Sequence, residues 1–199
     1  MPAPYRLSLT AASLLPAYMA AIAQAYAEQD GDWAATRAYV LAHDLLQTDK
    51  TSTAKRRYQE LELRLRALSE AQRERLAQAP ASEQRLLSFV ACCKSYPFLA
   101  GFVVEALLPK VRSHQLRLSP SDYHRYFEQE ALRVPRLEDI TDSTADKLRS
   151  RTLALVEEAG LLTGPEQVLT APYLPAALAR VLGRDAVYLL VDPVLASAP

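Results

Sequence analysis

The sequence predicts a mainly α-helical protein that carries a small β-hairpin. Its 199 residues are rich in Ala and Leu but include only five Gly, and this composition favours helices over a turn-rich β fold. Apolar residues recur at helical spacing along most of the chain, and Ser, Thr or Asp begins several of these stretches. We expect a helix-turn-helix-like N-terminal half, residues 1–79, followed by a helical core and a winged-helix-like region, residues 80–199.

Four helices are expected in the N-terminal half, each starting at a polar residue that can accept hydrogen bonds from the first helical N–H groups. Their expected ranges are 13–28, 32–46, 52–68 and 69–79, and their first residues are Ser13, Asp32, Ser52 and Ser69. The turn Asp30-Gly31 separates the first two helices, and the polar turn QTDKT precedes the third.

At Pro80 the composition changes from charged to strongly apolar, which favours a boundary there. Ser82 can cap a helix EQRLLSFVACCKSY, and Pro97 begins a second apolar helix, FLAGFVVEALLPKV. These two helices are the best candidates for the central core. The adjacent Cys92 and Cys93 suit neither a structural disulfide nor a metal site, so we expect both thiols to be reduced and buried.

The rest of the C-terminal half alternates helices with turns and ends in extended segments. The expected elements are a helix from Ser119, a short helical segment from Pro135, a helix over 144–158, a hairpin around Gly164-Pro165, a helix after Pro175 and a strand over 186–191. Residues 135–171 therefore have the element order of a winged helix-turn-helix. In that fold the second helix enters the major groove, and the hairpin lies along the DNA backbone.

The first turns of the helix over 144–158 form one candidate nucleic-acid contact. Hydroxyls and N–H groups at a helix N-terminus suit phosphate, and a basic side chain one turn later can reach phosphate or base edges. The candidate residues are Ser143, Thr144, Lys147 and Arg151. Asp142 and Asp146 oppose this hypothesis because they repel phosphate. The alternatives are an ordinary solvated helix and a surface for a protein partner.

The start of the third helix is the more basic candidate. Between residues 50 and 75 the chain has eight Lys or Arg against four acidic residues, and phosphate neutralisation supplies most non-specific affinity for nucleic acid. The candidate residues are Lys50, Thr51, Ser52, Thr53, Lys55, Arg56, Arg57 and Arg64. Alternatively, Glu60 and Glu62 pair with neighbouring Arg side chains, and the helix presents an ordinary solvated face.

Candidate catalytic features are weak. His43-Asp44 resembles the dyad of metal-dependent phosphohydrolases but lacks further ligands at suitable spacing, and Cys93 sits in an apolar stretch without a base. The sequence contains no Gly-rich phosphate-binding loop. Tyr123, Tyr126 and Phe127 could stack bases, but their helical spacing favours core packing. We expect a non-enzymatic protein with no catalytic residues, cofactor, metal or small-molecule substrate.

Charge and hydropathy restrict the partners further. Lys and Arg number 23, as do Asp and Glu, so any nucleic-acid contact must come from local clusters rather than from a global basic field. The start MPAPYRLSLTAASLL lacks the features of a signal peptide, and the apolar run 97–109 is shorter than a bilayer span and contains Glu105. We expect a cytoplasmic protein with no membrane contact.

Five stretches taken in order resemble the BrxA-like family of the bacteriophage-exclusion (BREX) defence systems. They are YRLSLTAASLL, LQTDKTSTAKRRYQELELRL, LLSFVACCKSYPFLAGFVVEAL, SDYHRYFEQEA and DSTADKLRSRTLALVEEAGLL, which together span about Tyr5 to Leu162. The resemblance implies a small, helical prokaryotic protein that works with a DNA methyltransferase, an ATPase and other BREX components. It also implies nucleic-acid binding, since members have been compared with an RNA-binding antitermination factor.

These observations predict a DNA-binding accessory protein of a BREX system that contacts duplex phosphates with little base specificity, because Arg and Lys at these positions serve phosphates as well as bases. Residues 51–57 are expected to supply most of the affinity, and residues 143–151 with the hairpin are expected to supply placement. The alternatives are an RNA-binding factor of antitermination type and a protein-only assembly subunit that binds other BREX components.

Overall fold

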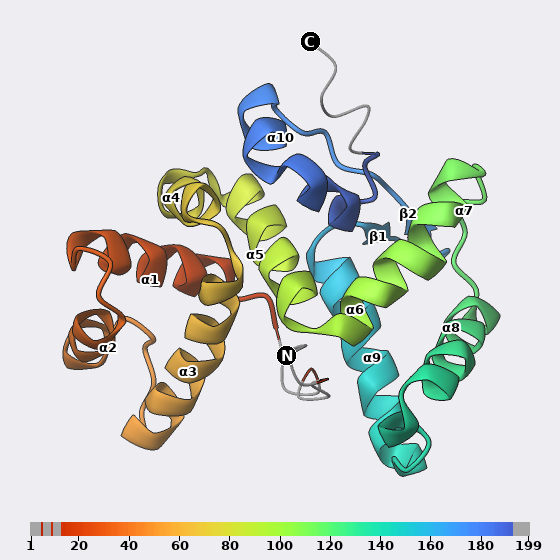
Figure 1. Ribbon diagram of the computed structural model, residues 1–199, viewed down its shortest axis with the longest axis horizontal. Coiled ribbons are helices and arrows are strands. Elements are labelled where there is room, and N and C mark those ends of the chain that lie inside the picture. Colours follow the sequence, from red (N-terminus) through yellow and green to blue (C-terminus); the bar gives the residue numbers. More distant parts are fainter. Residues whose placement is uncertain (1–4, 6–8, 10–12, 193–199) are drawn as a thin grey trace. The chain divides into compact units, whose positions relative to one another are not determined.

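The computed structural model describes residues 5, 9 and 13–192, and it confirms a mainly α-helical fold with a small β-hairpin (Figure 1). The chain forms two compact units. The N-terminal unit comprises residues 15–95, and the C-terminal unit comprises the described residues of 1–14 and 96–199. The sequence predicted a boundary at residue 80. The structure instead keeps the helix after Pro80 with the helices before it, so the division follows Ser95.

The N-terminal unit is built entirely from helices in its described elements. These are α1 (Pro16–Glu28), α2 (Trp33–Ala42), α3 (Thr51–Ala67), α4 (Glu70–Gln78) and α5 (Ala81–Ser95). α1 packs against each of the other four, and α5 also packs against α3 and α4. α5 is buried continuously from Leu86 to Cys93, which explains why this stretch is apolar all round except for Ser88. Cys92 and Cys93 are both buried, as predicted.

The helix starts agree with the sequence where a side chain caps the helix. The Asp32 carboxylate accepts hydrogen bonds from the N–H groups of Ala34 at 2.7 Å and Ala35 at 3.3 Å, and Ser69 forms a capping box with Gln72. Ser13 does not cap α1, contrary to the prediction. α1 begins at Pro16, which suits the first helical position, and the Ser13 hydroxyl instead donates to Glu158 at 2.9 Å.

Helices also dominate the described C-terminal unit. In chain order its elements are α6 (Pro97–Gly101), η2 (Phe102–Leu107), α7 (Leu108–Arg112), α8 (Pro120–Arg133), η3 (Pro135–Leu137), α9 (Asp142–Glu158), β1 (Leu162–Thr163), β2 (Val168–Leu169), α10 (Ala176–Leu182) and η4 (Gly183–Leu189). α6, η2 and α7 follow one another without a break, and η2 is a π-helical turn. α8 and η4 both pack against η2, so the run 97–112 organises this unit.

The predicted hairpin is present, and a third segment joins it. β1 and β2 are antiparallel, with Leu162 opposite Leu169. On the other edge of β2, Arg117 pairs with Val168; Leu118 N–H donates to Gln167 O at 3.0 Å, and Leu169 N–H donates to Leu116 O at 2.7 Å. The residues just before α8 therefore extend the hairpin, a pairing that was not predicted from the sequence.

The strand predicted over 186–191 is wrong. Residues 183–189 form the 3₁₀ helix η4, in which Ala186 and Leu189 are buried. These two residues are three apart, which places them on one face of a 3₁₀ helix. A short apolar run such as AVYLLV does not distinguish strand from helix by periodicity, and this explains the error.

α8 approaches α6 closely because residue 101 is glycine. The Tyr126 hydroxyl on α8 donates to Phe98 O at 2.8 Å, and a β-carbon at Gly101 would overlap that hydroxyl. Around this contact Phe98, Phe102, Tyr123 and Phe127 pack ring against ring, which agrees with the predicted core role of the aromatic residues of α8.

We predict that Gly101→Ala destabilises the protein by about 2 kcal/mol or more, because the added methyl forces the Tyr126 ring away. Tyr126→Phe alone loses one buried hydrogen bond and costs about 1 kcal/mol. The double variant should be less destabilised than the sum of the two, since the overlapping hydroxyl is then absent. Urea unfolding followed by circular dichroism measures all three, and strictly additive losses would contradict the close approach.

Candidate nucleic-acid interface

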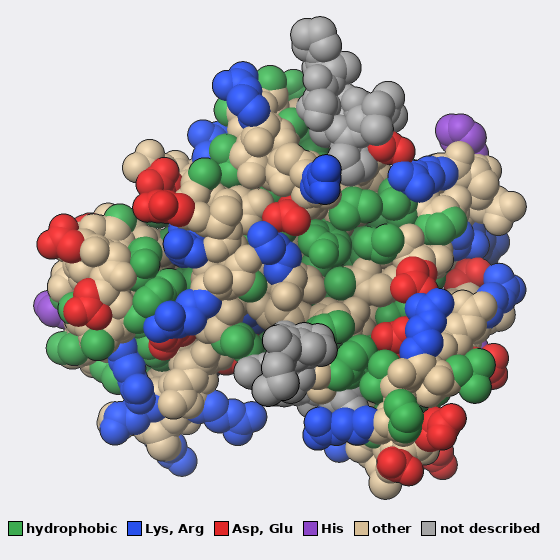
Figure 2. All heavy atoms as spheres, in the orientation of Figure 1, with side chains coloured by type: hydrophobic (Ala, Val, Ile, Leu, Met, Phe, Trp, Pro, Cys, Tyr) green, Lys and Arg blue, Asp and Glu red, His purple; other side chains and the backbone are tan. Residues whose placement is uncertain are grey.

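The start of α3 presents an exposed basic surface. Lys50, Thr51, Ser52 and Thr53 are exposed at its first turn, and Lys55 and Arg56 are exposed one turn later. Figure 2 shows Lys and Arg side chains gathered around this end of α3, at the lower left of the view. Within the described part of the chain, no ion pair neutralises Lys55 or Arg56, and no side chain caps α3. Free N–H groups and unpaired cations therefore occur together.

Arg57 has a structural role at the same helix start. Its guanidinium donates to Leu46 O at 3.1 Å and lies 5.7 Å from the centre of the Tyr18 ring, and its side chain is half-buried. This bond holds the loop after α2 against α3. Arg57 therefore contributes positive potential and positions the loop, while Lys55 and Arg56 remain free to contact a ligand.

Arg64 is not available for surface contact, which corrects the prediction that it binds nucleic acid. Its side chain is 1 % exposed, and its guanidinium bonds to the Glu60 carboxylate at 3.2 Å. The paired-charge alternative is thus correct for this part of α3: Glu62 likewise pairs with Arg66 at 2.7 Å. Both carboxylates are engaged four residues further along the helix, so they leave the cations of its first turns unneutralised.

The start of α9 is less basic than the start of α3. The Thr141 side chain caps the helix by accepting Thr144 N–H at 3.3 Å, and the two threonine hydroxyls lie 3.0 Å apart. Thr144 is therefore engaged in the cap, while Ser143, Lys147 and Arg151 remain exposed. The exposed acidic residues nearby are Glu138, Asp139, Asp142 and Asp146. These acidic side chains offset the positive charge of Lys147 and Arg151, which weakens this helix start as a phosphate site.

The hairpin next to α9 carries little free positive charge. Its sequence LTGPEQVL contains no Lys or Arg. Arg117, which the pairing with Val168 brings to the sheet, forms an exposed ion pair with Glu166 at 2.9 Å. Arg117 was not predicted to be part of this surface. The alternation in Leu116-Arg117-Leu118 was the available signal, but so short a stretch specifies no pairing partner.

The dyad considered for catalysis stabilises a turn in this structure. His43 Nδ1 lies 2.9 Å from Tyr39 O, and the Asp44 carboxylate accepts Thr48 N–H at 3.2 Å. Among the described residues, no group of three or more His, Cys, Asp or Glu side chains is arranged to hold a metal ion.

Membrane crossing by a single helix is not supported within residues 13–192. No single helix there is both long and apolar enough to cross a membrane. Only the pair of helices Ala81–Ser95 and Pro97–Arg112, which are joined at a bend, reaches the required length and hydropathy.

Comparison with known proteins identifies relatives in sequence and in structure. The family model BrxA matches residues 3–185. The BREX protein BrxA of Escherichia coli O9:H4 (strain HS) is 24% identical over 156 residues, which cover 76% of this chain and 73% of that protein. A crystal structure of an uncharacterized protein from Magnetospirillum magneticum superposes with a TM-score of 0.77 at 18% identity, covering 94% of this chain and 98% of the other. That structural likeness shows a shared fold.

We predict that the basic residues of α3 fall into two classes according to how their substitution changes the stability of the protein. Lys55→Gln with Arg56→Gln should change the free energy of unfolding by less than about 0.5 kcal/mol, because both side chains are exposed and unpaired. Arg64→Ala should destabilise by about 1–3 kcal/mol, because it removes a buried side chain and its bond to Glu60. Urea denaturation distinguishes them, and equal effects would contradict this division.

Proposed function

This chain belongs to the BrxA family, and from that premise we propose that it is a non-enzymatic accessory protein of a BREX phage-defence system that binds duplex DNA through its phosphates. The relative from E. coli bears the name BREX protein, which supports the defence role and the expectation that other BREX components are partners.

One observation carries the DNA-binding part of the proposal: exposed, unpaired cations surround an uncapped helix N-terminus at the start of α3. Backbone N–H groups there point along the helix axis, and the helix dipole adds a partial positive charge. Lys50, Lys55 and Arg56 add full charges within two turns. A phosphate group satisfies the N–H donors and neutralises the cations at once, as a neutral ligand cannot.

We assign the C-terminal unit a secondary role, which is to orient the protein on the DNA. Its order of α8, α9 and hairpin, with residues 116–118 completing the sheet on β2, is compatible with a winged-helix-like reader. Ser143, Lys147 and Arg151 lie exposed on α9, but the acidic residues around them argue against strong phosphate binding. We therefore assign most of the affinity to residues 50–56 and orientation to α9.

Two alternatives retain support from particular observations. Structured RNA presents the same phosphates, so the start of α3 does not by itself select DNA. A protein-only assembly role is favoured by the mixed charge of α9, since acidic and basic side chains together on an exposed helix surface also suit a protein partner.

Salt dependence of binding tests the proposal. We predict that duplex affinity falls steeply with salt, and that Lys55→Gln with Arg56→Gln reduces the slope of log K against log[salt] by about 2, near 0.9 for each lost phosphate contact. The matched variant Lys147→Gln with Arg151→Gln also removes two exposed cations but should reduce the slope less, because acidic neighbours already offset them. Fluorescence anisotropy with a labelled duplex measures both.

The same titrations with a structured RNA of equal phosphate number separate the alternatives. If the protein prefers RNA, and Lys55→Gln with Arg56→Gln reduces the salt slope of RNA binding by the same amount, an RNA-binding function of antitermination type would be favoured. Undetectable or salt-insensitive binding to both nucleic acids would refute the phosphate-binding role and leave the assembly role.

A further inference from the structure

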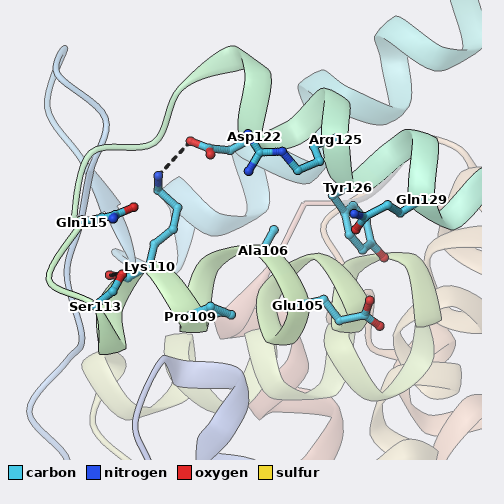
Figure 3. A pocket seen from close by; sticks show the side chains of 10 residues that line it. All are labelled: Glu105, Ala106, Pro109, Lys110, Ser113, Gln115, Asp122, Arg125, Tyr126 and Gln129. Atoms are coloured by element: carbon cyan, nitrogen blue, oxygen red, sulfur yellow. Dashed lines mark hydrogen bonds and ion pairs between the residues drawn. The ribbon is translucent and has the colours of Figure 1, made fainter.

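A polar cleft of about 240 Å³ lies within the C-terminal unit, between the helical run that includes η2 and α7 and the facing side of α8 (Figure 3). The residues that line it are Glu105, Ala106, Pro109, Lys110, Ser113, Gln115, Asp122, Arg125, Tyr126 and Gln129. None of these residues belongs to the basic helix starts discussed above, so the cleft does not depend on the proposed DNA contact.

The floor of the cleft lies where the helix 97–112 changes its winding. Residues 102–107 form the π-helical turn, which contributes Glu105 and Ala106, and Pro109 follows one turn later. The N–H of Leu108 donates to Val103 O, five residues back, as π winding requires. Such π-helical turns are rare and are frequently found at functional sites.

The charges around the cleft leave one cation without a partner. Lys110 Nζ pairs with the Asp122 carboxylate at 3.0 Å, and Glu105 pairs with Arg133. Burial opposes ionisation of Asp122, but hydrogen bonds from Ser119 and Lys110 outweigh it and hold the pKa of this carboxyl below its usual range, so the Asp122 carboxylate stays ionised at neutral pH. Arg125 has no ion pair within the described chain.

Figure 3 shows the Arg125 side chain extending along α8 toward the Lys110–Asp122 pair, with Gln115 and Ser113 across the cleft and Gln129 one turn further along. A guanidinium presents a fork of N–H donors that matches the two oxygens of a carboxylate or phosphate group, and amide and hydroxyl donors can complete its coordination. Both carboxylates of the cleft are already neutralised by their own partners, so they do not prevent an anion from entering.

We propose that this cleft binds a small oxyanion, a carboxylate or phosphate group, with Arg125 as its principal ligand and Gln129, Gln115 and Ser113 as neighbouring donors. The volume is below that of a drug-sized site and suits one such group with a few attached atoms. The group can belong to a free small molecule or to a phosphate of a nucleic-acid strand, and these two sources share the same chemistry at Arg125.

Nuclear magnetic resonance of the full chain tests the cleft. The protein is titrated with inorganic phosphate, with acetate, and with sodium chloride at matched ionic strength, and the backbone and arginine Nε–H signals are followed. We expect saturable shifts of Arg125, Gln129 and Ser113 with phosphate or acetate but not with chloride. Arg125→Gln should weaken this binding about tenfold or more, as loss of a charge-assisted hydrogen bond does.

Arg136→Gln is the matched control, because Arg136 is an exposed arginine of the same unit outside the cleft, and it should leave the binding unchanged. Arg125→Lys keeps the charge but loses the fork, and should bind with intermediate affinity. The thermal midpoint of each variant without ligand checks that folding is intact.

Chloride shifts equal to those of phosphate and acetate, or undiminished binding in Arg125→Gln, would overturn the proposal. A further arm adds a short duplex to wild-type protein and to Lys55→Gln with Arg56→Gln. Shifts at Arg125 identify the strand phosphate as the source of the group, and their absence, with phosphate or acetate still bound, identifies a free anion. If no duplex binds at α3, the result for phosphate or acetate binding at Arg125 is unaffected.

Discussion

The close contact of α8 with α6 is the constraint on which the described C-terminal unit depends. Tyr126 reaches the Phe98 carbonyl only because Gly101 has no side chain, and the resulting aromatic cluster fixes α8 on the run 97–112. That placement puts Arg125 and Gln129 opposite η2, and it sets where residues 116–118 begin before they pair with β2. A single glycine thus links the core, the sheet and the polar cleft of this unit.

In the N-terminal unit, arginine side chains that form bonds within the unit hold its parts together. Arg57 ties the loop after α2 to α3, and Arg64 is buried beside Glu60. Arginine serves such sites because its fork satisfies several acceptors while its stem packs against apolar groups. Lys50, Lys55 and Arg56 remain outside these bonds, so the surface charge of α3 is concentrated at its first two turns rather than spread along its length.

The sequence predicted most helices, their capping by Asp32 and Ser69, the hairpin and the buried cysteines, because all of these follow from local periodicity and local hydrogen bonding. The sequence did not predict the features that depend on contacts between residues far apart in the chain. Ser13 bonds Glu158 instead of capping α1, Arg64 is buried by packing that its position in a charged stretch does not reveal, and Arg117 joins β2 from far along the chain. The polar cleft was not predicted for the same reason, since Arg125 comes close to the other lining residues only when α8 packs against the run 97–112.

We expect nucleic-acid phosphates to contact the start of α3 more closely than the start of α9. Ser52 and Ser143 are matched probes, because each is the exposed second residue of its helix. A photoreactive amino acid placed at either position and irradiated with a labelled duplex measures the contact directly. We predict strong crosslinking from position 52 that high salt abolishes, and weaker crosslinking from position 143. Crosslinking from position 143 alone, or from neither position at saturating duplex, would contradict this expectation.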